Sequence, residues 1–147
     1  MRQLGLTLYK PDKAYHGYTL FTPSDGTSAY LMDMQGNMVQ RWQMPYRPGE
    51  YGYLLDNGNL LFAGSTGKSP VPFGGKGGKV MEVDWQGNTL WEYEEDTLHH
   101  DFCRMDNGNT MVLGWELVPS GLAKRIKGGQ PGTEAEGGIW CDYFREV

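Results

Sequence analysis

The sequence predicts an all-β fold, in the form of a partial β-propeller, and three observations lead to this prediction. The chain is rich in glycine, with 22 Gly among 147 residues, and 13% of its residues are aromatic. Two different turn motifs each occur twice, and both recur with almost the same spacing. The segments between these turns are short and apolar or aromatic, as strands are, and long segments with the periodicity of a helix are scarce.

The first repeated motif spans residues 31–39 and returns at residues 82–90. Gly36 corresponds to Gly87, which lies 51 residues later, and Asp33 corresponds to Asp84. In both copies the Asp side chain can accept hydrogen bonds from nearby backbone N–H groups, as is typical of turns. We therefore interpret each copy as a hairpin turn between two strands.

The second repeated motif is Asp-Asn-Gly-Asn between apolar runs, at residues 56–59 and 106–109. Gly58 corresponds to Gly108, which lies 50 residues later. Asn and Gly adopt positive φ at the lowest cost, and a two-residue hairpin loop requires positive φ. With two hairpins in each repeat, every repeat is predicted to hold four strands.

A four-stranded antiparallel sheet every fifty residues or so is typical of a propeller blade. We predict about two and a half such blades, which form one incomplete domain over residues 1–147. The first repeat covers about 29–78, the second about 79–138, and a third starts at 139–147. The alternative is a β-sandwich with repeated hairpins, which would not require both motifs to recur in one order with one period. The segment rich in Gly, Pro and Lys from Leu117 to Gly138 is predicted to be a loop insertion.

Propellers have about four to eight blades, so this number of strands cannot close a ring. We expect the sequence to be a fragment, because it stops within a predicted strand and an open array exposes its edges. For the same reason we expect these 147 residues alone to be enzymatically inactive.

Composition and charge exclude several classes of protein. The net charge of −5, with both signs mixed along the chain, provides no basic surface for phosphates and argues against nucleic-acid binding. No apolar run has the length of a signal peptide or a membrane span, so the chain as written is expected to be cytoplasmic and to have no membrane partner. Cys103 and Cys141 are too few for a disulfide framework or a zinc site, and we expect both to be small buried side chains.

The polar segment at residues 98–103, Leu-His-His-Asp-Phe-Cys, departs from the repeat just before the second Asp-Asn-Gly-Asn turn. With the 50-residue offset, His100 takes the position of Glu50, and Asp101 takes that of Tyr51. Equivalent positions of several blades converge near the axis of a propeller. A histidine there, oriented by a neighbouring carboxylate, can act as a nucleophile or as an acid–base group. The alternative is that both histidines lie in a surface connection and have no chemical role.

Three other features are assigned structural roles. The adjacent side chains of His99, His100 and Asp101 cannot easily all bind one ion, so we predict no metal site. The glycine-rich run at residues 74–79 lacks the pattern of a phosphate-binding loop, because Val80 stands where Ser or Thr is needed, and we predict a connection between blades. The five tryptophans are predicted to pack between blades rather than to bind an aromatic ligand or a sugar.

The order Asp-x-x-Gly-Asn…Trp, followed by His-His-Asp…Asn-Gly-Asn, resembles the bacterial arylsulfotransferase (aryl-sulfate sulfotransferase) family from about Tyr18 to Val147. The resemblance implies a six-bladed propeller that moves a sulfo group from a phenolic sulfate ester to a phenol through a transiently sulfated histidine. It also implies a small-molecule donor and acceptor, no cofactor, and a periplasmic location if the N-terminus is incomplete. His100 is the one residue that the resemblance assigns to catalysis, as the nucleophile or as an auxiliary histidine, and no substrate-binding residue is assigned.

The alternative function is a non-catalytic propeller that serves as a binding or scaffolding module. The two hypotheses differ in what precedes later Asn-Gly-Asn turns, because a sulfotransferase requires further His-Asp pairs and at least one Arg there. A quinoprotein dehydrogenase would require calcium ligands beside a quinone stacked on Trp, and the sequence contains no such set.

Overall fold

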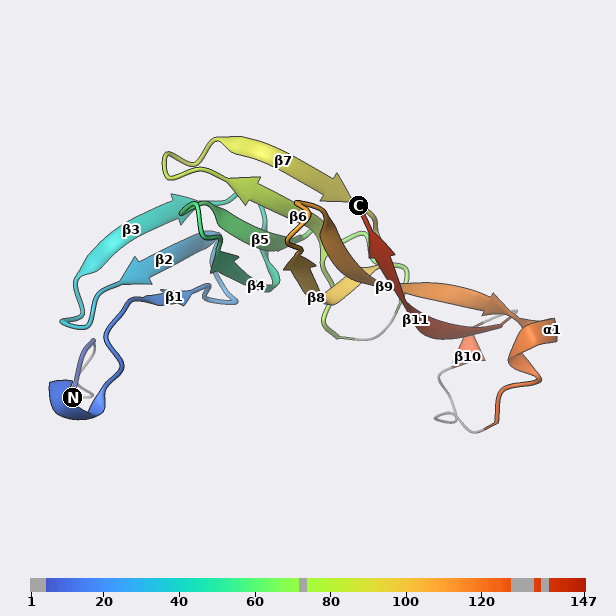
Figure 1. Cartoon of the computed structure of the whole chain (residues 1–147). Coiled ribbons are helices and arrows are strands. Elements are labelled where there is room, and N and C mark those ends of the chain that lie inside the picture. Colours follow the sequence, from blue (N-terminus) through green and yellow to red (C-terminus); the bar gives the residue numbers. More distant parts are fainter. Residues whose placement is uncertain (1–4, 72–73, 128–133, 136–137) are drawn as a thin grey trace.

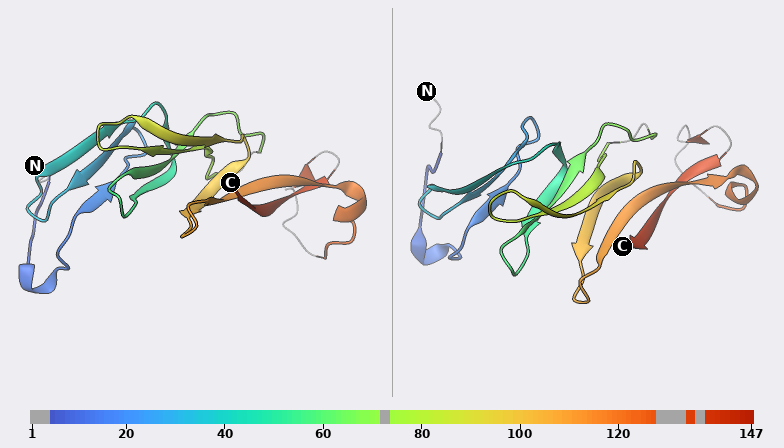
Figure 2. Two further views of the ribbon diagram at one scale, coloured as in Figure 1. Left: turned by 45° about the horizontal axis from the view of Figure 1, so that its top comes forward. Right: turned by 90° about the horizontal axis from the view of Figure 1, so that it is seen from above.

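The computed structural model describes residues 5–71, 74–127, 134–135 and 138–147, and these residues confirm the all-β prediction. They form three antiparallel sheets that follow one another along the chain (Figure 1). The two views in Figure 2 show the sheets side by side, with the sheet nearest the N-terminus at one end of the array. The described residues form no closed sheet, so a closed propeller remains a prediction.

Each sheet is built from strands that are consecutive in sequence. Sheet 1 follows the 3₁₀ turn η1 (Pro11–Lys13) and contains β1 (Thr19–Phe21), β2 (Ser28–Met32) and β3 (Met38–Gln43). Sheet 2 contains β4 (Arg47–Leu54), β5 (Leu60–Ser65), β6 (Gly78–Val83) and β7 (Thr89–Glu94). Sheet 3 contains β8 (Leu98–Arg104), β9 (Thr110–Pro119), β11 (Gly138–Glu146) and β10 (Glu134–Ala135), and the short helix α1 (Ser120–Ala123) follows β9. In sheet 3 alone the order in space differs from the order in the chain, because β11 lies between β9 and β10.

The boundaries of the sheets fall inside the sequence repeats. The repeat at 29–78 supplies β2 and β3 to sheet 1, and it supplies β4 and β5 to sheet 2. The spacing of the motifs fixes the length of a repeat but not the residue at which it begins. Sheets that begin in the middle of a predicted repeat are therefore compatible with the period of 50 to 51 residues. Among the described residues, only sheet 2 has four full strands, because sheet 1 has three and β10 in sheet 3 has two residues.

Both turn motifs fold in the same way in their two copies. Asp33 accepts hydrogen bonds from the backbone N–H of Asn37 and from its side-chain amide, at 2.8 and 2.9 Å. Asp84 accepts the same pair of bonds from Asn88, both at 2.8 Å. The prediction that these carboxylates organise their own turns is therefore confirmed.

The prediction of a two-residue loop at the Asp-Asn-Gly-Asn motif was wrong. Leu55 and Asn59 pair across the turn, because the Leu55 N–H donates to the Asn59 carbonyl at 2.8 Å, so the loop holds three residues. Gly58 has φ of 84° and takes the left-handed position alone, as in three-residue hairpins that end in a bulged glycine. Asn57 instead accepts the backbone N–H of Asn59 with its side-chain oxygen.

The segment predicted to be a loop insertion, Leu117–Gly138, is in part regular structure, so that prediction is corrected. The strand β9 continues to Pro119, and β11 pairs with it along its whole length. The apolar residues Leu117 and Val118 lie opposite Trp140 and Ile139, which suits an antiparallel pair. The two strands project as an arm beyond the rest of sheet 3 (Figure 1).

Sheet 2 lies between sheets 1 and 3 and is buried on both faces. We call the side of a sheet that faces the next sheet along the chain its leading face, and the opposite side its trailing face. The trailing face of sheet 2 packs against the leading face of sheet 1. This cluster consists of Ala29, Leu31, Trp42, Met44, Leu60, Phe62, Met81 and Val83.

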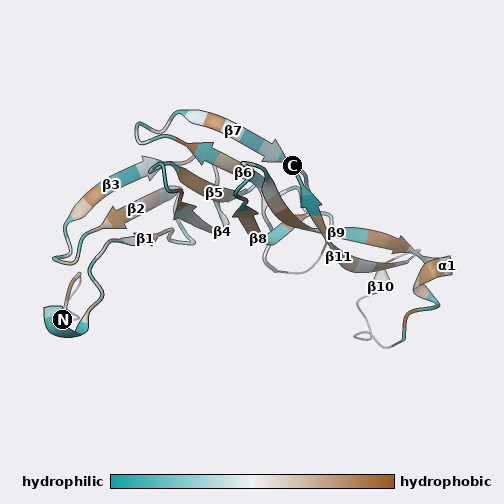
Figure 3. Ribbon diagram, viewed as in Figure 1, coloured by the Kyte–Doolittle hydropathy of each residue, from teal (hydrophilic) through white to brown (hydrophobic). Residues whose placement is uncertain are grey.

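The leading face of sheet 2 packs against the trailing face of sheet 3 in a second apolar cluster. Its members are Leu61, Ala63 and Val80 from sheet 2, with Leu98, Phe102 and Val112 from sheet 3. Successive residues of a strand point to opposite faces, so Phe62 contributes to one cluster and Leu61 to the other. This double burial explains why β5 is almost continuously apolar, and it is coloured brown along most of its length in Figure 3.

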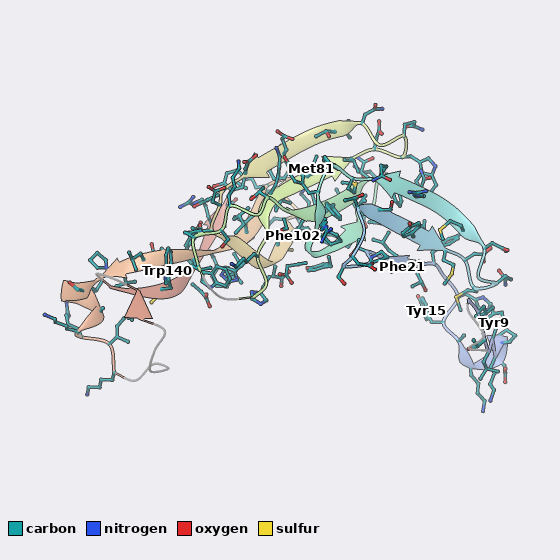
Figure 4. All side chains as sticks on the ribbon, turned by 180° about the vertical axis from the view of Figure 1, so that it is seen from behind. Tyr9, Tyr15, Phe21, Met81, Phe102 and Trp140 are labelled. Carbon is teal, nitrogen blue, oxygen red and sulfur yellow. The ribbon has the colours of Figure 1, made fainter. Side chains whose placement is uncertain are left out.

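Two of the tryptophans confirm the prediction of packing between sheets. Trp42 is 1% exposed in the first cluster, and its indole N–H donates to the Asp84 carbonyl of the next sheet at 2.9 Å. Trp91 packs against the second cluster. Figure 4 shows the same order in space, since Phe21 lies on sheet 1, Met81 and Phe102 lie in the middle of the array, and Trp140 lies on the arm.

Polar contacts also join sheets 2 and 3 around Glu95, which follows β7. The Tyr93 hydroxyl donates to this carboxylate at 2.6 Å, the Tyr143 hydroxyl donates to it from β11, and Arg145 forms an ion pair with it. Burial of Glu95 raises its pKa, but the hydrogen bonds from both tyrosines and the charge of Arg145 outweigh burial and hold the pKa below its usual value.

The expectation that both cysteines are buried was wrong. Cys141 is half-buried, and Cys103 is exposed on the leading face of sheet 3, which no described residue covers. None of the helices in the described ranges is long and apolar enough to cross a membrane.

Candidate functional site

The two histidines lie in an irregular part of β8, which is the edge strand of sheet 3. Leu98 pairs with Gly114 and Phe102 pairs with Val112, so residues 99–101 lie opposite a single residue of β9. Such a bulge changes the direction of the side chains that it carries, and bulges are frequent next to active sites.

The edge strand of sheet 2 contains the same irregularity at the equivalent place. Pro48 pairs with Gly64 and Gly52 pairs with Phe62, which leaves residues 49–51 opposite one residue of β5. Glu50 and Tyr51 therefore occupy the bulge of β4 as His100 and Asp101 occupy that of β8. The sequence offset predicted this correspondence of residues, whereas the bulges themselves were not predicted.

The bulged residues of the two strands lie next to each other. The Tyr51 hydroxyl donates to Oδ1 of Asp101, and the His100 ring, when it is protonated, acts on the Glu50 carboxyl by its charge. Burial raises the pKa of Glu50, and both the charge and the backbone N–H of His100 partly oppose this effect. Oε1 of Glu50 is buried without a hydrogen-bond partner among the described residues. Equivalent positions of adjacent sheets thus converge, as they do near the axis of a propeller.

His100 has a backbone conformation that is rare for a residue with a side chain. Its φ of 53° is the only positive φ among the described non-glycine residues. The backbone N–H of His100 donates to the Gly75 carbonyl at 3.1 Å, and the N–H of Gly77 donates to the Leu98 carbonyl at 2.9 Å. The glycine-rich segment before β6 therefore pairs with the bulge and holds it in place.

Gly75 is required at this contact because any larger residue would overlap the His100 ring. A Cβ atom at position 75 would lie 2.2 to 2.7 Å from ring atoms of His100, which is closer than van der Waals contact allows, and the φ of 74° also favours glycine there. This contact gives the glycine-rich run a physical role that differs from phosphate binding.

His99 is buried behind His100, with 5% of its surface exposed. Its ring stacks on Trp115 of β9, with 3.7 Å between the ring centroids and 13° between the planes. Nε2 of His99 lies 3.3 Å from Oδ1 of Asp142 on β11, and Nδ1 lies 2.9 Å from Nδ1 of His100. Burial lowers the pKa of His99, although the Asp142 carboxylate opposes this shift.

These contacts favour one arrangement of protons. We assign the ring proton of His99 to Nε2, because the negative charge of Asp142 lies 3.3 Å from it, although this nitrogen has no hydrogen bond of good geometry among the described residues; Nδ1 of His99 is then the acceptor. Nδ1 of His100 is then the donor in the contact between the two rings, and Nε2 of His100 keeps an unprotonated lone pair. An imidazole in this state is a nucleophile, and His100 is exposed to solvent.

The carboxylate that the sequence suggested as the orienting group is engaged elsewhere. Asp101 accepts the Tyr51 hydroxyl and the Phe102 backbone N–H, the latter at 2.8 Å. Burial, followed by the hydrogen bond to Asp101, raises the pKa of Tyr51 well above its usual value. The carboxylate that acts on His100 is instead that of Asp142, and it does so through the ring of His99.

Sequence reasoning missed His99, Trp115 and Asp142 as members of one cluster. The pairing of β9 with β11 brings Asp142 opposite Trp115, and no local pattern in the sequence signals that pairing. The glycine-rich run was a usable signal, because several glycines in succession indicate a close approach of another segment.

The space around the cluster is small. The crevice between sheets 2 and 3 beside His99 and Glu50 has a volume of about 10 Å³, which is too small for a ligand. A wider hollow, of about 550 Å³, lies at the turn end of β4 and β8 and is open to solvent. It is lined by Tyr53, Leu54, Leu55, Asp56, Asn57, Glu82, Arg104, Met105, Asp106 and Gly108.

No group of three or more His, Cys, Asp or Glu side chains among the described residues is arranged to hold a metal ion. Comparison with known proteins gave no match, either among models of protein families, among curated proteins or among solved structures.

Proposed function

We propose that His100 accepts and passes on a sulfo group in an arylsulfotransferase reaction, with a phenolic sulfate ester as donor and a phenol as acceptor. The observation that carries the proposal is the contact of 2.9 Å between Nδ1 of His99 and Nδ1 of His100, on an exposed bulge. The sequence resemblance supplies the class of reaction, and the contact explains how one nitrogen of His100 is kept available for it.

In the first step, the lone pair on Nε2 of His100 attacks the sulfur atom of the aryl sulfate. An N–S bond forms, the bond between sulfur and the aryl oxygen breaks, and the phenolate leaves with the electron pair of that bond. Positive charge develops on the His100 ring, and the contact with Nδ1 of His99 allows the Nδ1 proton of His100 to be shared. The negative charge of Asp142 on the far side of His99 stabilises this state.

In the second step, the oxygen of the acceptor phenol attacks the same sulfur atom and the N–S bond breaks. The phenolic proton passes to a base, and the electron pair of the N–S bond returns to Nε2 of His100. Glu50 is the base that we assign among the described residues, because burial raises the pKa of its carboxyl and makes the carboxylate a better proton acceptor. The sulfuryl oxygens require cationic donors, and the proposal assigns these to the further sheets of a complete ring.

Because those donors are assigned to sheets other than the three described, we expect no turnover from a single copy of the chain, and the first half-reaction is the informative test. The chain is incubated with a large excess of a chromogenic aryl sulfate, and covalent sulfation is located by peptide mass spectrometry. We expect the addition of one SO₃ group to His100 and none to His16, which is exposed and serves as an internal control. Equal labelling of His16 and His100, or no labelling of His100, would contradict the proposal.

The alternative, a non-catalytic binding or scaffolding module, is favoured by one observation. The hollow of about 550 Å³ lies between the two Asp-Asn-Gly-Asn turns, away from the bulges, and it is lined largely by polar side chains. The sulfation experiment separates the two functions, because a binding module has no reason to sulfate His100 faster than His16.

A further inference from the structure

The three sheets follow one rule of packing, in which the leading face of each sheet meets the trailing face of the next. At the junction of sheets 2 and 3, the leading face of sheet 2 presents Leu61, Ala63 and Val80. Their exposed fractions are 0%, 5% and 3%. These residues are buried only because sheet 3 covers them.

Sheet 3 has a leading face with the same design. The pairing of β5 with β6 places Ala63 opposite Val80, and the pairing of β9 with β11 places Leu113 opposite Phe144. The sequence offset of 50 residues relates Ala63 to Leu113, so Phe144 corresponds to Val80. By the same offset Met111 corresponds to Leu61.

This leading face of sheet 3 is uncovered. Phe144 is 75% exposed, whereas its counterpart Val80 is 3% exposed. Phe144, Met111, Leu113 and Cys103 surround a shallow hollow of about 80 Å³. The residues that pack sheet 2 onto sheet 3 therefore recur on sheet 3 without a partner among the described residues.

Sheet 1 offers the complementary half at the other end of the array (Figure 1). Its trailing face carries Phe21 and Tyr30, which pair across β1 and β2 and stack with 5.3 Å between ring centroids. In sheet 2 the equivalent pair is Phe62 and Met81, which are 0% and 3% exposed against sheet 1. Phe21 is 38% exposed.

We propose that two copies of this chain assemble head-to-tail, with the leading face of sheet 3 in one copy packed on the trailing face of sheet 1 in the other. The interface continues the packing already present at the two junctions within the chain. Each copy contributes three sheets, so two copies form a closed array of six, within the range of four to eight blades that propellers adopt. Three copies would bring nine sheets, which exceeds that range, so the dimer is the expected species.

The test is the molar mass in solution, measured by sedimentation velocity over a range of concentrations. We expect the wild-type chain to form a dimer, and we expect Phe144→Lys and Phe21→Lys each to remain monomeric because each blocks one half of the interface. Both side chains are exposed within the chain, so these variants are expected to fold normally. Leu90→Lys is the matched control. Leu90 is 56% exposed on β7 of sheet 2, so it lies neither on the leading face of sheet 3 nor on the trailing face of sheet 1.

Mixing the two blocked variants tests the head-to-tail arrangement directly. The Phe21→Lys chain keeps an intact leading face on sheet 3, and the Phe144→Lys chain keeps an intact trailing face on sheet 1. We therefore expect an equimolar mixture to form heterodimers through one junction. If Phe144→Lys prevents association while Phe21→Lys does not, two leading faces meet and the proposal is wrong.

Thiol labelling provides a second readout on the unmodified chain. Cys103 lies in the proposed interface, and Cys141 lies on the arm outside it. Labelling of Cys103 is expected to slow severalfold as the concentration rises, with labelling of Cys141 unchanged. A wild-type chain that is monomeric at every concentration, or a Leu90→Lys variant that also dissociates, would overturn the proposal.

Discussion

The positive φ of His100 depends on a single neighbouring residue, Gly75. Replacement of Gly75 by Ala adds a Cβ atom where the His100 ring lies, and it also places a side chain at a φ of 74°. We expect Gly75→Ala to displace the ring and to reduce the reactivity of His100 toward diethyl pyrocarbonate by about tenfold or more, a change of about 1.4 kcal/mol in the activation free energy. Peptide mass spectrometry measures this rate.

Gly74→Ala is the control for that experiment. The φ of Gly74 lies outside the left-handed range, and a Cβ atom there would meet no atom within 4 Å. The control is expected to react as the wild type does. If both variants lose reactivity equally, the loop as a whole, rather than the contact of Gly75 with the ring, determines the state of His100.

The buried ring of His99 gives the fold a dependence on pH. Burial lowers the pKa of His99 in the folded chain, whereas in the unfolded chain the pKa is near its model value of 6.5. Protonation therefore favours the unfolded state, so the stability contributed by the neutral ring is complete above pH 6.5 and declines as the pH falls below it. The loss is at most about 1.4 kcal/mol for each pH unit below 6.5.

Chemical denaturation of the wild type and of His99→Gln between pH 7.5 and pH 5.5 measures this effect. Glutamine does not titrate, so the free energy of unfolding of the variant is expected to change less over this interval. Parallel curves for the two proteins would show that His99 can be protonated in the fold without cost.

At the scale of the strands, Glu95 links β7 to β11 by three polar contacts. We expect Glu95→Gln to lower the free energy of unfolding at pH 7 by about 1 kcal/mol, because a neutral amide pairs less strongly with two tyrosine hydroxyls and Arg145. The value is kept small because the Arg145 side chain is 48% exposed and water screens the ion pair.

The pH dependence of this link has the opposite sign to that of His99. The pKa of Glu95 is lowered in the fold, so its contribution is present above the model value of 4.5 and is lost as the pH falls through the folded value. The difference between wild type and Glu95→Gln should thus disappear in acid. Glu116→Gln, at an exposed position of β9, is the control and is expected to leave the stability unchanged.

The elements that could be predicted from the sequence are those that local residues determine. Gly36, Gly58, Gly87 and Gly108 all take a positive φ at hairpin loops, so their spacing located the strands and the period. The bulge at residues 99–101 could not be predicted, because it results from the pairing of β8 with β9 on one side and with the Gly75 segment on the other. The end of β9 beyond Glu116 was included in the predicted loop, because the Gly, Pro and Lys residues that follow it obscured a short apolar extension of the strand.

At the scale of the whole molecule, the burial of the cysteines shows the limit of reasoning from one residue at a time. Cys103 is a small apolar residue in a strand, as core residues often are. Its counterpart in sheet 2, Tyr53, packs in the cluster between sheets 2 and 3. Cys103 is exposed because its sheet is the last of the described array, so burial here depends on the number of sheets rather than on the local sequence.

The same dependence predicts a gradient of stability across the array. Sheet 2 is covered on both faces, and sheets 1 and 3 are each covered on one, so opening of either outer sheet disrupts one apolar cluster whereas opening of sheet 2 disrupts both. We expect backbone amides of β5 and β6 to exchange with deuterium at least about tenfold more slowly than those of β2 and β11, since a difference of about 1.4 kcal/mol in opening free energy has that effect. The measurement is native-state hydrogen exchange of the monomeric Phe144→Lys chain, in which the proposed interface cannot protect the outer sheets. Uniform protection of all three sheets would show that the array unfolds as one cooperative unit, and the two clusters would then not act as separate junctions.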